Sequence, residues 1–118
     1  MSEMNRLEDQ LLAILQTHQG KAQAITVDEL QQLVPISTRK IRAVIARLVT
    51  EHRIPIASST QLPYGFYLIT SEEEARQCMR QYWSRVREVS RRARRLNMAV
   101  KDRFGIDLQQ EFSFDDPS

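Results

Sequence analysis

A capping signal and a proline fix the organisation of the middle of the chain. Thr26 is followed three residues later by Glu29, a capping box in which each side chain satisfies a free amide of the first helical turn. The helix that it opens is expected to bury Leu30 and Leu33. It ends there, because Pro35 excludes the residue before it from helical geometry. A second apolar run at helical spacing follows the proline, so the sequence predicts two helices joined by a tight turn.

Further segments frame this pair of helices. Apolar residues at helical spacing predict an earlier helix over residues 5–18, with Gly20 as its C-cap. Residues 54–57 and 66–69 are predicted as antiparallel strands, and residues 58–65 form a loop, or wing, too long for a two-residue turn. The predicted fold class is mainly α (α+β): a winged helix-turn-helix with a β-hairpin wing, a fold used mostly to place one helix in the major groove of DNA.

A long helix is predicted over residues 71–104, where Gly105 can stop it. Its apolar residues recur at intervals of 4, 3, 4, 3, 4, 3 and 4, the repeat of a coiled-coil seam. A second copy of the chain, in a homodimer or higher oligomer, is the simplest cover for this seam. A parallel pair gives Arg85 and Arg92 no acid partner, and an antiparallel pair, or packing of the first turns on the winged helix, fits equally well. The seam comprises Ala75, Met79, Tyr82, Val86, Val89, Ala93, Leu96 and Val100.

Charge divides the chain further. Residues 76–103 hold ten basic and two acidic side chains, whereas residues 106–118 hold four acids and no base. We therefore predict a winged helix-turn-helix domain over residues 1–70, a long basic oligomerisation helix over residues 71–104, and an acidic tail over residues 105–118. The tail has three interpretations: a disordered end, a short docking peptide for a replication protein, or an acid–base fold-back onto the basic helix.

The predicted helix over residues 38–52 has one face suited to a DNA groove. If Ile41 marks its buried side, small side chains lie opposite, flanked by basic residues that can reach a guanine edge or a phosphate. The capped start of the helix can also donate amides to a phosphate. The alternative is an ordinary solvated face. The candidate DNA-binding residues are Ser37, Thr38, Arg39, Lys40, Arg42, Ala43, Ala46 and Arg47.

Four basic residues of the long helix recur every seven positions and form one continuous stripe. Such a stripe can track the phosphates of a nucleic acid, duplex or single-stranded, and each contact adds to the salt dependence of binding. The alternative is again a solvated face. The candidate phosphate-tracking residues are Arg80, Arg87, Arg94 and Lys101.

The segment ISTRKIRAVIARLVTEHRIPIAS, followed by YGFYLI and SEEEARQ, resembles the winged helix of the biotin-repressor type. The likeness is stronger to small prophage-encoded DNA-binding proteins and covers about residues 7–97. The resemblance implies double-stranded DNA binding in phage transcription regulation or replication. It implies no biotin ligase activity, because no segment resembles the catalytic domain of that enzyme. Winged helices also bind proteins, so a protein–protein interaction adaptor without sequence-specific DNA binding is the alternative.

The sequence contains no catalytic constellation, so we expect neither enzyme activity nor a cofactor. Cys78 lacks a histidine partner pattern. His18 and His52 lie alone near helix ends, where a histidine can cap by charge, and a metal site needs more ligands. No apolar run approaches the ~20 residues of a membrane span, and a single cysteine fits a reducing compartment. We therefore expect a protein of the bacterial cytoplasm or nucleoid.

Overall fold

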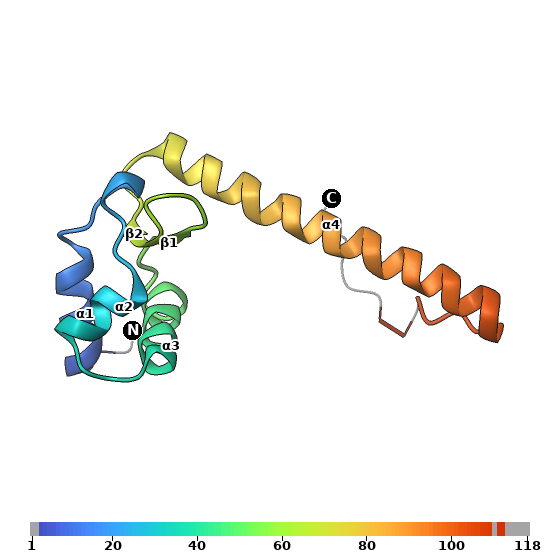
Figure 1. Ribbon diagram of the computed structural model, residues 1–118, viewed down its shortest axis with the longest axis horizontal. Helices are drawn as coiled ribbons and strands as arrows, with labels where there is room; N and C mark the ends of the chain where they lie inside the picture. Colours follow the sequence, from blue (N-terminus) through green and yellow to red (C-terminus); the bar gives the residue numbers. More distant parts are fainter. Residues whose placement is uncertain (1–2, 110, 113–118) are drawn as a thin grey trace. The chain divides into compact units, whose positions relative to one another are not determined.

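Figure 1 shows the computed structural model, which describes residues 3–109, 111 and 112. The chain divides into two compact units, Met1–Cys78 and Met79–Ser118. The described residues are mainly helical, with one two-stranded antiparallel sheet and a long C-terminal helix. This arrangement agrees with the α+β class that the sequence predicts.

Side-chain caps begin the three α-helices that open the first unit. α1 covers Arg6–Leu15, α2 covers Val27–Leu33 and α3 covers Thr38–Thr50. The capping box of α2 is confirmed: Glu29 N donates to Thr26 Oγ1, and Thr26 N donates to Glu29 Oε1, each over 3.1 Å. The bounds of α2 are those that the capping box and the proline predict.

Two helix ends differ from the prediction. α1 stops at Leu15, because the chain after it tightens into short-range bonds such as His18 N to Leu15 O over 2.9 Å. Gly20 therefore does not cap α1; with a φ of 85° it precedes η1, a 3-10 helix over Lys21–Gln23 that the sequence did not predict. The start of α3 is confirmed, but the helix ends at Thr50, two residues early.

The hairpin consists of β1 (Ile56–Ser59) and β2 (Gly65–Leu68), which pair antiparallel with Ile56 opposite Leu68. The first strand begins two residues later than predicted. The reason lies in the preceding chain: Ile54 N donates back to Leu48 O over 3.0 Å, and Pro55 has no amide to give to the ladder. The second strand begins and ends one residue earlier than predicted.

β2 is bonded along both of its edges, since its second edge pairs with the chain that leads into α2. Phe66 N donates to Ile25 O over 2.7 Å, and Ile25 N donates to Phe66 O over 2.9 Å. Further along, Gly20 N donates to Leu68 O over 2.8 Å. The backbones approach so closely that a Cβ on Gly65 would lie 2.2 Å from Ile25 O. The hairpin is therefore part of the domain rather than an appendage.

The core of the first unit lies between α1, α2 and α3. Its fully buried side chains include Leu11, Leu30, Ile41 and Leu48. The expectation that Leu33 is buried is wrong: it is 59% exposed. The extended Val34, which is buried, turns its own side chain into the core in its place.

α4 covers Glu72–Phe104, so the predicted long helix is confirmed, as is its end at Gly105, whose φ is 71°. Ser71 and Glu74 have the spacing of a capping box at the start of this helix, and that box is present only in part. Glu74 N donates to Ser71 Oγ over 3.1 Å, but the Glu74 carboxylate accepts from Thr70 N over 3.0 Å and from Lys21 N over 2.9 Å. Glu74 thus ties the start of α4 to η1.

In the second unit the chain after α4 folds back, in agreement with the acid–base interpretation of the tail. Asn97 Nδ2 donates to Asp107 Oδ1 over 3.0 Å, and Leu108 N donates to Asn97 Oδ1 over 3.0 Å. Lys101 Nζ lies 3.9 Å from Asp107 Oδ2. The bond from Asn97, then that from Gln109 N, hold the pKa of Asp107 below its ordinary value of 3.8, so this carboxylate stays ionised. Residues 110 and 113–118 of the predicted tail lie outside the described residues.

The close approach at Gly65 generates a prediction. Gly65→Ala should lower the free energy of unfolding of the first unit by ~3 kcal/mol or more, because strain at positive φ adds to a clash with backbone. Gly20→Ala is the matched control, since it shares the strain but its Cβ would meet nothing closer than 3.7 Å. We expect about 1–3 kcal/mol there, from backbone strain without the clash, measured by chemical denaturation. Equal losses for the two variants would contradict the close-approach account.

Candidate nucleic-acid interface

α3 is fixed in rotation by its buried face. Ile41, Val44, Ile45 and Leu48 are all buried, as the apolar spacing predicts. The opposite face, on which Arg39, Ala43, Ala46 and Thr50 lie, is exposed. The two alanines therefore form a low surface along the middle of an exposed helix, which a groove wall could approach closely.

The N-terminal end of α3 holds two exposed basic residues. Arg39 and Lys40 form no ion pair with any acid in the described parts of the chain. Ser37 Oγ accepts from Lys40 N over 3.1 Å, so this hydroxyl already has a donor. Thr38, half-buried, is the first helical residue, and its amide points toward the helix start, where an anion is favoured.

Arg42 lies against the hairpin. Its Cζ is 5.9 Å from the centre of the Phe66 ring on β2, within the range of a cation–π contact. The residue remains exposed, so its guanidinium is also available to a ligand. This contact restricts the freedom of one of the two arginines that the sequence assigns to base reading.

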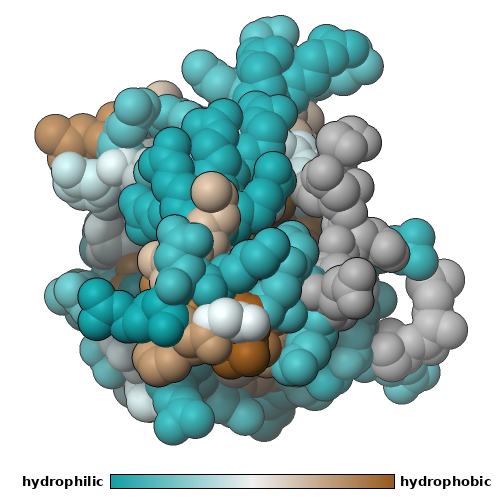
Figure 2. Space-filling view, turned by 90° about the vertical axis from the view of Figure 1, so that its right-hand side faces the viewer, coloured by the Kyte–Doolittle hydropathy of each residue, from teal (hydrophilic) through white to brown (hydrophobic). Residues whose placement is uncertain are grey.

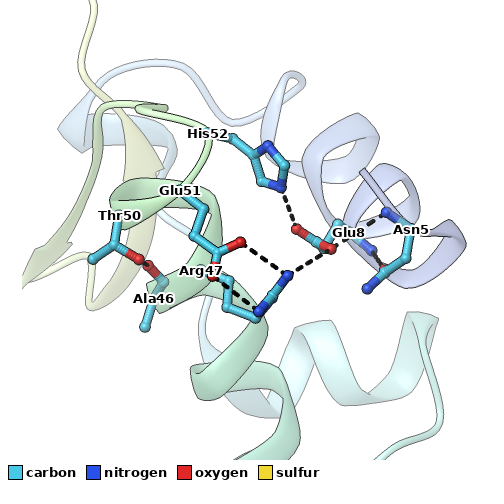
Figure 3. Close-up of polar contacts among 7 residues, drawn as sticks. All are labelled: Asn5, Glu8, Ala46, Arg47, Thr50, Glu51 and His52. Carbon is cyan, nitrogen blue, oxygen red and sulfur yellow. Dashed lines mark hydrogen bonds and ion pairs between the residues drawn. The ribbon is translucent and has the colours of Figure 1, made fainter. Parts of the chain in front are cut away.

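Arg47 lies in a network of acids that sequence reasoning missed (Figure 3). Its Nη2 is 3.0 Å from Glu51 Oε2 and 3.8 Å from Glu8 Oε1. Glu8 is fully buried, and its other oxygen lies 2.6 Å from His52 Nε2. Arg47 is thus partly neutralised within the fold, unlike Arg39.

The Glu8–His52 contact corrects the view of His52 as an isolated helix-end cation. The His52 side chain is 6% exposed and joins the end of α3 to α1. A signal existed in the sequence: Glu8 is spaced three and seven residues from the core positions Leu11 and Leu15, so an acid stands on the buried face of α1. An acid on such a face requires a partner, and that partner lies 44 residues away.

The hydrogen bonds around Glu8 determine its ionisation. Burial raises the pKa of its carboxyl group, but bonds from Asn5 N and His52, with the positive charges of His52 and Arg47, hold the pKa below the ordinary 4.5. Because the folded pKa is lowered, the stability that ionised Glu8 contributes is fully present above pH 4.5. It is lost as the pH falls through the folded value.

This linkage predicts the behaviour of Glu8→Gln. Above pH 4.5 the variant should melt at a lower temperature than the parent. The difference between the two melting temperatures should become smaller as the pH falls below that value. Glu51→Gln is the control, because it removes an exposed carboxylate from the same arginine, and exposed pairs contribute only about 0–1 kcal/mol. Thermal melts followed by circular dichroism give both comparisons. A gap that widens in acid would show that ionised Glu8 does not stabilise the fold.

The loop between β1 and β2 carries no base of its own, but the fold brings one to it. Lys21, in η1, donates through Nζ to Gln61 Oε1 over 3.0 Å. Leu62 and Tyr64, beside it, are 78% and 53% exposed. No local pattern could have predicted the lysine at this loop, because 40 residues separate it from Gln61.

In the second unit the predicted stripe lies on exposed positions of α4. Arg94 Nη2 donates to Ser90 Oγ over 3.0 Å, and Lys101 faces Asp107 of the fold-back. Arg87 is exposed and forms no ion pair with a described residue, while Arg80 has a further contact of its own. Hydrophilic side chains cover most of the face seen around the C-terminal end of α4 in Figure 2, with apolar side chains emerging between them.

Within the described residues, no group of three or more histidine, cysteine, aspartate or glutamate side chains could hold a metal ion. No helix in that part of the structure combines the length and apolar character needed to cross a membrane. The chain matches no protein-family model, no curated protein and no solved structure.

Proposed function

We propose that the first unit is a winged helix-turn-helix that binds double-stranded DNA with α3 in the major groove. One observation carries the proposal: the exposed face of α3 combines two alanines with the basic residues Arg39, Lys40 and Arg42. A helix with small side chains at its centre can enter the groove deeply, and arginines near its start can then reach base edges.

The contacts within the fold support different roles for the basic residues of α3, some contacting bases and others contacting phosphates. Arg42 is restrained near Phe66, so less conformational entropy is lost when its guanidinium meets a guanine edge. Arg39 shares the reading role, while Lys40 and the capped start at Ser37 and Thr38 contact backbone phosphates. Arg47 is already bound by two carboxylates, so it is the least expected of the eight candidate residues to contact DNA.

Two further basic regions extend this proposal. Lys21 supplies the loop between β1 and β2 with a positive charge, so this loop can act as a wing despite its own lack of bases. On α4, Arg80, Arg87, Arg94 and Lys101 follow phosphates, adding affinity without sequence information. On the basis of the resemblance to prophage proteins, we propose a role in phage transcription regulation or replication, in the bacterial cytoplasm or nucleoid.

The reading role of α3 is tested by Arg39→Ala combined with Arg42→Ala. Each lost bidentate base contact should cost about 1–3 kcal/mol, so we expect at least a tenfold rise in the dissociation constant for a selected duplex. The measurement is a fluorescence-anisotropy titration over a range of salt concentrations, with the duplex first selected from a random pool.

Arg6→Ala is the control for that test, since it removes one exposed charge from α1, which is not the proposed reading helix. It should leave affinity within about twofold. Duplex affinity that is unchanged by the double substitution, or reduced equally by Arg6→Ala, would refute α3 as the reading helix.

A protein–protein interaction adaptor is the second candidate. The exposed Leu62 and Tyr64 at the hairpin tip favour it, because an apolar tip suits a protein surface better than a phosphate backbone. The tail, including Phe112, is a candidate docking peptide for a replication protein. A partner captured from a host lysate that survives nuclease treatment, and is lost in Leu62→Ser with Tyr64→Ser, would support the adaptor.

A further inference from the structure

The apolar stripe of α4 in the second unit has no cover within the described part of the chain. α4 contains no buried residue, and along the stripe only Val100, beside the fold-back, is half-buried. Hydrophobic side chains in a single line at 3.5-residue spacing match the a and d positions of a two-stranded coiled coil. In the second unit this stripe comprises Met79, Tyr82, Val86, Val89, Ala93, Leu96 and Val100.

The residues beside the stripe distinguish the two ways in which identical helices can pair. The a positions are Met79, Val86, Ala93 and Val100, and the d positions are Tyr82, Val89 and Leu96, so that Arg85 and Arg92 are g residues. In a parallel, in-register pair, each g position faces the e position five residues later on the other helix. Arg85 then meets Ser90, and Arg92 meets Asn97, so no like charges oppose each other. In an antiparallel pair the g positions face one another. In the registers that overlap most of the stripe, Arg85 or Arg92 of one helix then meets Arg92 of the other. Charge therefore favours the parallel arrangement.

Within its own helix Arg92 pairs with Glu88, four residues before it, over 3.0 Å. The fold-back supplies a second acid, at the e-position edge of the stripe, where the repeat itself has none. Asp107 is held on Asn97, the e-position residue that faces Arg92 in the parallel pair, by the 3.0 Å bond from Asn97 Nδ2. The bond from Gln109 N to Asp107 Oδ1, also 3.0 Å, keeps the carboxylate there. The carboxylate of Asp107, ten residues after Asn97 in the sequence, thus lies at the edge of the stripe.

We propose that two copies of this chain pair through the α4 stripe as a parallel, in-register coiled coil, in which Arg92 of each copy binds Asp107 of the other. The partner is a second copy because the stripe is complementary to itself and each copy carries both members of the charge pair. The pairing does not depend on DNA. It would give a twofold axis, and a DNA target of a twofold dimer is an inverted repeat.

The first test compares two residues that are almost equally exposed in a single chain. Val89, at a d position, is 62% exposed, and Met98, at an outer f position, is 64% exposed. In sedimentation equilibrium without nucleic acid, the full chain should dimerise, and Val89→Lys should raise the dissociation constant by ~100-fold or more. Met98→Lys should leave it within about twofold. A chain that is monomeric up to its solubility limit, or equal effects of the two substitutions, would overturn the proposal.

The second test isolates the charge pair. Asp107→Asn keeps an acceptor oxygen for Asn97 and Gln109 but removes the charge. We expect about a 2- to 5-fold weaker dimer, and no additional loss when Arg92→Gln is combined with it. Asp102→Asn, at the outer c position, is the control and should have no effect. Additive losses from the two substitutions would show that Arg92 and Asp107 do not meet.

Orientation is tested by cysteine cross-linking in a Cys78→Ser background. Leu96→Cys should form a disulfide-linked dimer under mild oxidation, because in-register parallel helices bring each d residue next to its copy. Met98→Cys, on the outer side, should not. A dimer that Leu96→Cys fails to cross-link would rule out the parallel, in-register geometry, whereas cross-linking by Leu96→Cys alone would support it.

Discussion

The burial of one side of α3 is the constraint on which the account of the first unit depends. Ile41 and Leu48 are completely buried, so the helix cannot rotate without exposing them to water. Fully burying such a side chain stabilises a fold by about 1.5–3 kcal/mol. The face with Ala43 and Ala46 is therefore held outward by the core, and whatever α3 binds must meet this face.

Polar contacts within the fold then determine which charged side chains of α3 remain available to bind an anion. Glu8, buried between His52 and Arg47, joins α1 to the end of α3 and reduces the charge at that end. Arg39 and Lys40, at the other end, lack such neighbours among the described residues. The positive charge of the helix is thus concentrated at its N-terminal half, where the helix dipole also favours an anion.

Local signals were sufficient to predict much of the fold. Capping residues and Pro35 gave the bounds of α2, and apolar spacing identified the buried side of α3, because these depend on neighbours within a few residues. Contacts between distant residues were not predictable in the same way. The side chain of Leu33 was placed wrongly, Lys21 was not expected at the hairpin loop, and the Glu8–His52 pair depends on residues from two helices. The same holds for Asp107, which reaches the edge of α4 only because the chain folds back after Gly105.

Mapping of amide chemical shifts during titration with a DNA duplex would test the central claim most directly. If α3 enters the major groove, the largest shifts should fall on the backbone amides of residues 37–47, with smaller ones at Lys21 and the β1–β2 loop. The core amides of α1 should change little. Shifts confined to α4, or absent from α3 when duplex is bound, would contradict the account.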